Sequence, residues 1–113
     1  MKGWIIVNGF LYTDKFSEIA EMFVNAATAH RIRLEVKSNC EIYSGIFEMD
    51  PSVEKPDFVL FWDKDIILAR YLEISGIPVF NNSKAIEICD DKRKTYTAFL
   101  EAGLPIPPTV SAP

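Results

Sequence analysis

Two unbroken apolar runs dominate the pattern of the chain, at residues 4–7 and 58–62. Runs of this kind are typical of strands that are covered on both faces, so we predict two fully buried strands. Residues 32–37 instead alternate strictly between apolar and polar side chains, which predicts a half-exposed strand at a sheet edge. Residues 77–80 are predicted as a short fourth strand, and residues 42–47 as a small hairpin.

Apolar residues at helical spacing occupy the segments between these strands. The first predicted helix carries one inward stripe: Phe16, Ile19, Ala20, Phe23, Ala26 and Ala27. Thr13 or Asp14 is expected to cap it, because an oxygen there accepts the free amides of the first turn. A second helix is predicted from about residue 64 to residue 75, with Gly76 as its C-terminal stop. Its inward residues are expected to be Ile67, Leu68, Tyr71 and Leu72.

Two further helices are predicted after the fourth strand. Ser83 is expected to cap a short helix that carries Cys89 into the core. Asp90 and Asp91 open the next helix, which ends at Gly103. The apolar stripe of this last helix consists of Tyr96, Phe99 and Leu100. An extended segment follows at residues 104–110, because its prolines forbid helix.

Strands that alternate with helices imply an α/β fold, a three-layer, doubly wound and mostly parallel sheet of about four strands. With the alternating strand at the edge, the predicted strand order is 2-1-3-4, and the chain reverses direction between the first and third strands. Such sheets bind ligands outside the carboxyl ends of the strands at this switch point. Five residues that follow these two strands form the predicted substrate cleft: Asn8, Gly9, Asp63, Lys64 and Asp65.

The charged part of this cleft has two interpretations. Asp63 can cap the following helix while Asp65 favours its positive end, since caps of this kind are common. Alternatively, the charges of Asp63, Lys64 and Asp65 face the cleft and bind a polar substrate. Asn8 and Gly9 also fit a simple tight turn. The pattern GxGxxG does not occur in the sequence, which argues against a Rossmann-type dinucleotide cofactor.

Lys92, Arg93 and Lys94 place three cations in the first turn of a predicted helix, where the backbone dipole is already positive. Local rules are broken most often at functional sites, and free amides together with cations make a natural phosphate site. The alternative is that the long side chains extend into water, while Asp90 and Asp91 compensate their charge. Both interpretations stay open on these physical grounds.

Composition and charge restrict the class of protein further. The 113 residues carry a net charge of -4, with a pI of about 4.9. Because an acidic chain repels phosphate backbones and anionic membranes, we expect neither nucleic acid nor a membrane as partner. Cys40 and Cys89 show no metal-ligand spacing, so we expect reduced thiols in a cytoplasmic protein. With His30 as the single histidine, no metal site is expected.

The C-terminal part of the chain contains a succession of short motifs, in which a short strand, Asn-Ser, a helix, Asp-Lys and a helix precede a proline-rich segment. The residues concerned are Val79-Phe80-Asn81-Asn82-Ser83, Ala85-Ile86, Asp91-Lys92, Thr95-Tyr96, Leu100 and Gly103-Leu104-Pro105-Ile106-Pro107-Pro108-Thr109. This succession resembles the ATP-grasp ligases, and within them the RimK-like glutamate ligases. It departs from their pattern mainly at Leu104, where isoleucine is usual. Residues 7–10 and 62–65 are similar to a RimK-like subgroup.

The resemblance implies a pre-ATP-grasp domain at residues 1–90, then a helix and extended linker at residues 91–113 that lead into an ATP-grasp domain. Such ligases phosphorylate a carboxylate with ATP, and an amine then displaces phosphate from the acyl phosphate. In relatives the lysine of the Asp-Lys pair contacts the ATP phosphates, so the resemblance implies that Lys92 binds nucleotide. The intact enzyme would use ATP and Mg²⁺ with a small carboxylate, amino-acid or peptide substrate.

The family's glycine-rich loop, adenine-pocket lysines and magnesium-binding acids would lie beyond Pro113. We therefore expect no catalytic residue in this chain, no ligation by the chain alone, and no tight binding of ATP or Mg²⁺ to it. Two other functions stay open, a non-enzymatic flavodoxin-like binding or regulatory module and a structural domain that forms a homodimer. A phosphoacceptor receiver domain is disfavoured, because it needs an acidic pair where this chain has Asn8 and Gly9.

Overall fold

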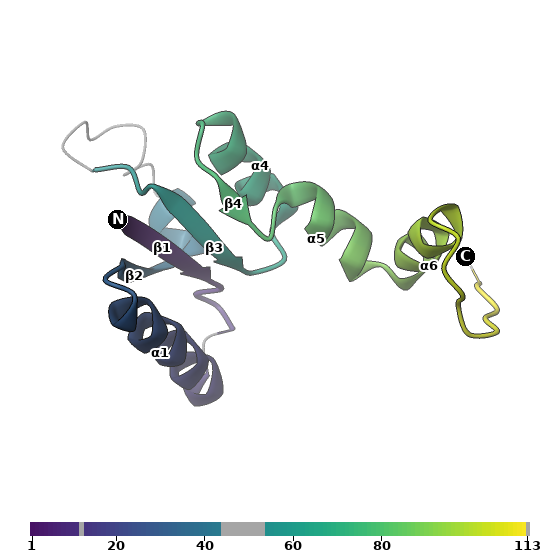
Figure 1. Ribbon diagram of the computed structural model, residues 1–113, viewed down its shortest axis with the longest axis horizontal. Coiled ribbons are helices and arrows are strands. Elements are labelled where there is room, and N and C mark those ends of the chain that lie inside the picture. The colour runs from purple at the N-terminus through teal and green to yellow at the C-terminus, as the bar shows by residue number, and fades with distance from the viewer. Residues whose placement is uncertain (12, 44–53, 113) are drawn as a thin grey trace.

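A four-stranded parallel sheet organises the molecule, as seen in the computed structural model, which describes residues 1–11, 13–43 and 54–112 (Figure 1). The strands are β1 (Lys2–Val7), β2 (Arg33–Ser38), β3 (Phe58–Trp62) and β4 (Val79–Phe80). They lie in the order β2-β1-β3-β4, and every neighbouring pair is parallel. The predicted fold class and the predicted 2-1-3-4 order are therefore confirmed.

Helices cover both faces of this sheet, which gives three layers (Figure 1). The helices of the described residues are α1 (Asp14–Ala29), α2 (Asn39–Glu41), α4 (Ile66–Ile74), α5 (Ser83–Asp90) and α6 (Lys92–Glu101). Of the predicted hairpin at residues 42–47, residues 44–47 lie outside the described ranges. Its two described residues, Ile42 and Tyr43, continue in a helical turn after α2 rather than in a strand. No helix in the described ranges is long and apolar enough to cross a membrane.

The strand register divides the core between the two faces. In β1, Trp4 and Ile6 stand beside Val59 and Phe61 of β3, and this face packs under α4. The alternate β1 residue Ile5 faces the other side, where Leu34 and residues of α1 complete a second cluster. Because helices cover both faces of β1, residues 4–7 are buried without interruption, as their apolar run predicts.

Helices cover the other elements less completely than β1, and several predicted burials are wrong for that reason. β3 is buried only at Val59 and Phe61 and is not the fully buried strand predicted, because α1 packs chiefly against β2 and covers the other face of β3 only in part. Ile67 is 77% exposed although its spacing fits the inward stripe of α4. Ala26 and Cys89 are also exposed, so Cys89 does not enter the core.

The helix ends follow the expected chemistry, with two caps displaced by one or two residues. Asp65, rather than Asp63, caps α4 by accepting from the Leu68 amide at 3.0 Å. Asn82, rather than Ser83, caps α5. Thr13 occupies the cap position of α1 without a side-chain hydrogen bond, whereas Asp91 caps α6 as predicted.

Helices α5 and α6 form an arm that extends away from the sheet (Figure 1). α6 packs mainly against α5 and contains no buried residue. The molecule is elongated as a result, with extents of 51 × 31 × 26 Å and a radius of gyration of 16.5 Å. A compact chain of this length would have a radius of gyration of about 13 Å. The extended segment after Gly103 is exposed at nearly every position, as its prolines predict.

Candidate functional site

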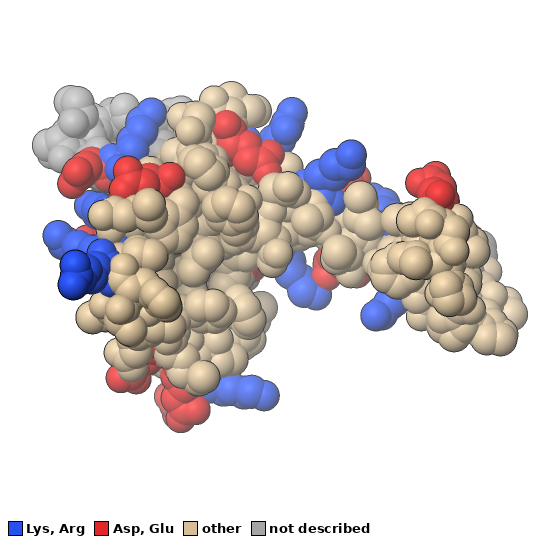
Figure 2. All heavy atoms as spheres, in the orientation of Figure 1, with Lys and Arg blue, Asp and Glu red and all other residues tan. Residues whose placement is uncertain are grey.

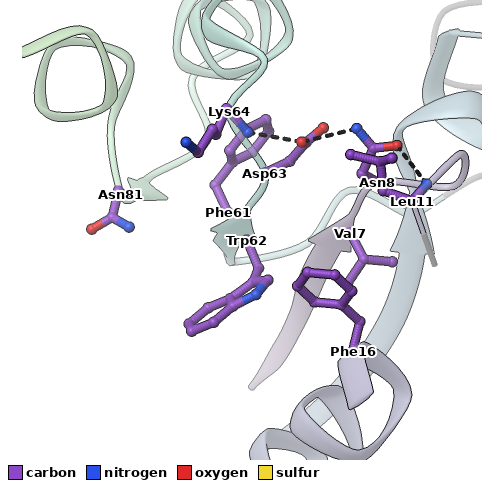
Figure 3. A pocket seen from close by; sticks show the side chains of 9 residues that line it. All are labelled: Val7, Asn8, Leu11, Phe16, Phe61, Trp62, Asp63, Lys64 and Asn81. Carbon is purple, nitrogen blue, oxygen red and sulfur yellow. Dashed lines mark hydrogen bonds between the residues drawn. The ribbon is translucent and has the colours of Figure 1, made fainter. Parts of the chain in front are cut away.

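An open groove lies at the carboxyl ends of β1 and β3, where the sheet order reverses and the sequence predicts a cleft. It has a volume of about 460 Å³ and is lined by Val7, Asn8, Leu11, Phe16, Phe61, Trp62, Asp63, Lys64 and Asn81. Asn8, Asp63 and Lys64 lie along one side, and Trp62 and Phe16 lie along the other (Figure 3). The groove therefore offers a polar wall opposite an apolar wall. We refer to it as the strand-end groove.

The polar wall is held by a hydrogen-bond network that joins the ends of three strands. The Asn8 side chain accepts from the Phe10 amide at 2.9 Å. Figure 3 shows that it also accepts from the Leu11 amide at 3.2 Å and donates from Nδ2 to Asp63 Oδ1 at 3.2 Å. Asp63 Oδ1 also accepts from the Lys64 amide at 2.8 Å. Of the predicted cleft residues, Asn8, Asp63 and Lys64 are thus brought together, and Asp63 serves the groove instead of capping α4.

Asn39 anchors this network from below, although sequence reasoning does not single it out. Its residue surface is only 7% exposed, and its Oδ1 accepts from the Gly9 and Cys40 amides, each at 2.9 Å. Its Nδ2 donates to Asp63 Oδ2 at 3.4 Å. A side chain at Gly9 would lie 3.1 Å from Cys40 Sγ, so glycine permits the close approach of these two turns.

Asp65, the fifth predicted cleft residue, does not line the groove. Its Oδ1 caps α4, while its Oδ2 accepts from the Tyr43 hydroxyl at 2.7 Å. Partial desolvation of the phenol, this hydrogen bond, and the negative charges of Asp65 and Asp63 raise the pKa of Tyr43 to about 12. Tyr43 is therefore neutral at physiological pH and serves as the hydrogen-bond donor to Asp65.

The apolar wall is built from aromatic side chains of two elements. Trp62 is 43% exposed, and its ring packs against Phe23 of α1 with the ring centroids 5.4 Å apart. Phe16 comes from the first turn of the same helix. An exposed indole beside a second ring provides a surface on which an apolar or cationic group can pack.

Lys64 connects the groove to the arm. Its ammonium group lies 2.5 Å from Asp90 Oδ1, at the last residue of α5. Both side chains are largely exposed, at 78% and 41%, so salt screens this pair and its contribution to stability is small. The pair nevertheless neutralises the one cation that lines the groove.

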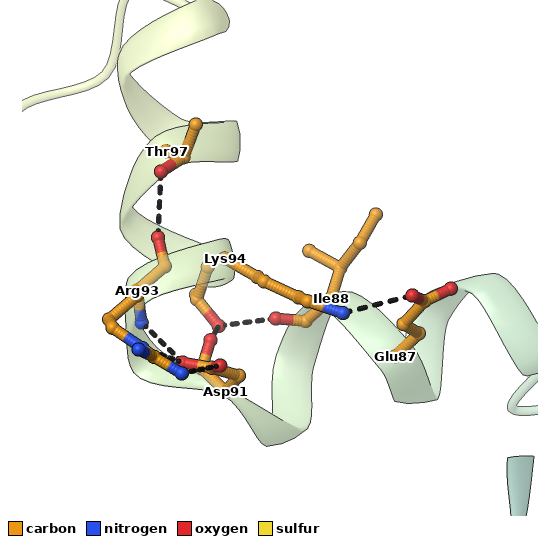
Figure 4. Close-up of polar contacts among 7 residues, drawn as sticks. Glu87, Ile88, Asp91, Arg93, Lys94 and Thr97 are labelled. Atoms are coloured by element: carbon orange, nitrogen blue, oxygen red, sulfur yellow. Dashed lines mark hydrogen bonds and ion pairs between the residues drawn. The ribbon is translucent and has the colours of Figure 1, made fainter. Parts of the chain in front are cut away.

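The cations of α6 lie outside the strand-end groove. Arg93 pairs with Asp91 at 2.8 Å and Lys94 pairs with Glu87 at 2.9 Å, so both are compensated by acids (Figure 4). Hydrogen bonds from the side chain and the amide of Arg93 lower the pKa of Asp91 to about 2. Lys92 makes no ion pair within the described part of the chain, which leaves its ammonium group available to a ligand. Of the predicted compensating acids, Asp91 pairs with Arg93, whereas Asp90 pairs with Lys64, and Lys94 is paired with Glu87 instead.

The described residues contain no group of three or more metal-ligating side chains. The strand-end groove is instead suited to binding a small molecule with one polar end and one apolar body. These features define the chain as a doubly wound α/β domain with an open groove at its switch point. A comparison of the sequence with models of known protein families finds no match.

Proposed function

We propose that this chain is the N-terminal domain of an ATP-dependent carboxylate–amine ligase of the RimK-like type, which works through an acyl phosphate. The observation that carries the proposal is the strand-end groove. It collects Asn8, Asp63 and Lys64 from two separate segments that are similar to a RimK-like subgroup. In this proposal the groove holds part of a substrate, and Lys92 contacts the phosphates of ATP.

The arm supports the same proposal. Lys92 opens α6 with an ammonium group that no acid of the described residues compensates, and free amides of a first helical turn favour anions. The Lys64–Asp90 contact lies between the groove and this turn. A ligase needs its substrate close to the nucleotide, because the carboxylate oxygen attacks the γ-phosphorus as ADP leaves, and the amine then displaces phosphate.

The test is formation of ADP by the complete product of the gene, with Mg²⁺ and pooled amino acids or short peptides. We expect ADP and phosphate in equal amounts, and only when both a carboxylate and an amine are supplied. A buffer without added amine serves as the control. The proposal would be contradicted if ADP formed at the same rate without the added substrates, or if no ADP formed with any of them.

A dimerising domain is a second candidate, favoured by one observation. Phe99, Leu100 and Leu104 expose apolar surface on α6 and just after it. The visible surface of α6 is largely uncharged in the view of Figure 2. Sedimentation of the chain over a range of concentrations tests this candidate, and a dimer that Phe99→Ser dissociates would support it.

A further inference from the structure

The two walls of the strand-end groove differ in what they can offer a ligand. The apolar wall supplies Trp62 and Phe16, and the polar wall supplies Asp63 within a network of amide groups. The net charge of the polar wall therefore determines whether a cationic or an anionic group of a ligand binds beside it.

Asp63 is a carboxylate without a cationic partner. Within the described residues, no lysine, arginine or histidine forms an ion pair with it. The residues outside the described ranges, 12, 44–53 and 113, contain none of these three residue types. Its hydrogen bonds come instead from neutral donors, the Asn8 and Asn39 side chains and the Lys64 amide. The negative charge of Asp63 is thus solvated but not neutralised.

Asp63 also retains an acceptor position. A carboxylate has about four lone-pair sites. Two hydrogen bonds reach Oδ1, and a single long one of 3.4 Å reaches Oδ2. The Asp63 carboxylate, which lines the groove, therefore keeps lone-pair capacity for a further donor.

The nearest cation cannot offset this charge without losing its own partner. Lys64 is paired with Asp90, so an incoming carboxylate would have to displace Asp90 while lying next to Asp63. The carboxylates of Asp63 and Asp65 both lie at this end of the sheet and make the potential there negative. A cationic ligand end gains from this potential, whereas an anionic end is repelled.

We propose that the strand-end groove binds the amine-bearing substrate of the ligation in its ammonium form, with the ammonium group at Asp63 and an aliphatic or aromatic body against Trp62 and Phe16. This inference rests on the proposed function and assigns the groove to the amine rather than to the carboxylate. The exposed indole strengthens the choice, since an aromatic face attracts a nearby cation as well as an apolar body. Asn8 and Asn39 act as positioning residues, because they hold the Asp63 carboxylate toward the groove.

The experiment compares two probes of similar shape and opposite charge, phenethylammonium and hydrocinnamate. Each is titrated into the chain while backbone amide resonances are followed by NMR. The Lys64 amide reports on Asp63, because it donates to Oδ1 at 2.8 Å, and the Gly9 amide reports on Asn39. We expect phenethylammonium to shift both resonances and to bind at least tenfold more tightly than hydrocinnamate.

Variants separate the carboxylate from the groove itself. Asp63→Asn is expected to weaken phenethylammonium binding by about tenfold or more, since a charge-assisted hydrogen bond is lost. Glu101→Gln changes the net charge equally at the far end of α6 and should leave binding unchanged. If Asp63→Asn does not fold, the preference of the unaltered chain between the two probes decides.

Three results would overturn the inference: hydrocinnamate binding as tightly as phenethylammonium, no shift with either probe, or an Asp63→Asn variant that binds phenethylammonium normally. Hydrocinnamate binding that Lys64→Met abolishes would assign the groove to the carboxylate. Each of these outcomes leaves the proposed ligase function standing if substrate-dependent ADP formation is observed. Ammonium binding without any ADP formation would instead retain the groove assignment and reject the ligase.

Discussion

The sheet body, to which α5 contributes the buried Ile86, and the last helix α6 are stabilised in different ways. In the body, Leu72 of α4 has none of its surface exposed and packs in a cluster that spans β1, β3 and β4. In the arm, Leu100 of α6 is 59% exposed, and the helix relies on its Asp91 cap and on surface ion pairs. Burial makes the larger contribution to stability, so the fold depends on the body, and α6 retains apolar surface for contacts outside it.

This difference also indicates how the functional groups are placed. The strand-end groove is part of the body, and its network is fixed by buried or half-buried groups such as Asn39 and Asp63. Lys92 stands on α6, which packs mainly against α5 and contains no buried residue. The groove is thus held by part-buried hydrogen bonds, whereas the Lys92 side chain stands on a helix without any buried residue.

The largest expected effect comes from the same substitution made in each region. Leu72→Ala should lower the free energy of unfolding by about 2–5 kcal/mol, because it leaves a cavity under the sheet. Leu100→Ala should change it by less than about 0.5 kcal/mol, because its side chain is already in solvent. Urea unfolding of both variants measures the two values. An equal loss of unfolding free energy in both variants would show that α6 belongs to the same cooperative core, and would contradict the difference between the two regions.

The next effect concerns the network beneath the groove. Asn39→Ala should cost about 1–3 kcal/mol of unfolding free energy, because it leaves the Gly9 amide without its acceptor in a partly buried turn. Asn25→Ala, on the exposed face of α1, should be neutral or slightly stabilising, since alanine favours helix. Thermal and urea unfolding check both. If the two variants lose the same stability, the network is not what orders the strand ends.

We expect acid to destabilise the first turn of α6 at a higher pH than it unfolds the sheet body. Hydrogen bonds from the Arg93 side chain and amide lower the pKa of Asp91 from 3.8 to about 2. A carboxylate with a depressed pKa stabilises the folded form above its unfolded pKa, and that stabilisation is lost as the pH falls from 3.8 toward 2. Hydrogen exchange in the first turn of α6 should therefore rise in this window, and Asp91→Asn should flatten the response. An unchanged α6 at pH 2 would contradict this account of its cap.

Much of the fold could be predicted from the apolar pattern. An unbroken apolar run predicts an inner strand such as β1, and an alternating run predicts an edge strand, so the strand order follows. The pattern identifies the apolar face of a helix but not whether another element covers that face. For this reason the predicted burial of Ile67 and Cys89 is wrong. The cleft followed from topology, yet Asn39 was missed since its segment shows no helical period. The signal that could have found it is Ser38 three residues before Glu41, a capping box that starts α2 beside Asn39.

The family assignment and the role of Lys92 stay predictions, and one substitution tests them together. In the complete gene product, Lys92→Ala should weaken ATP binding by on the order of 1.5–3 kcal/mol, the value of a charge-assisted phosphate contact. It should leave the melting temperature unchanged or slightly higher, because a cation in the first turn opposes the helix dipole. Lys84→Ala, on neighbouring α5, is the matched control and should alter neither quantity.

Calorimetric titration with ATP beside thermal unfolding of the unaltered protein and of both variants is the most direct measurement. The account predicts that Lys92→Ala alone loses nucleotide affinity while it melts at the original temperature or above. If Lys92→Ala binds ATP normally and melts much earlier, Lys92 is a structural residue of α6, and the assignment of this helix to a nucleotide site is wrong.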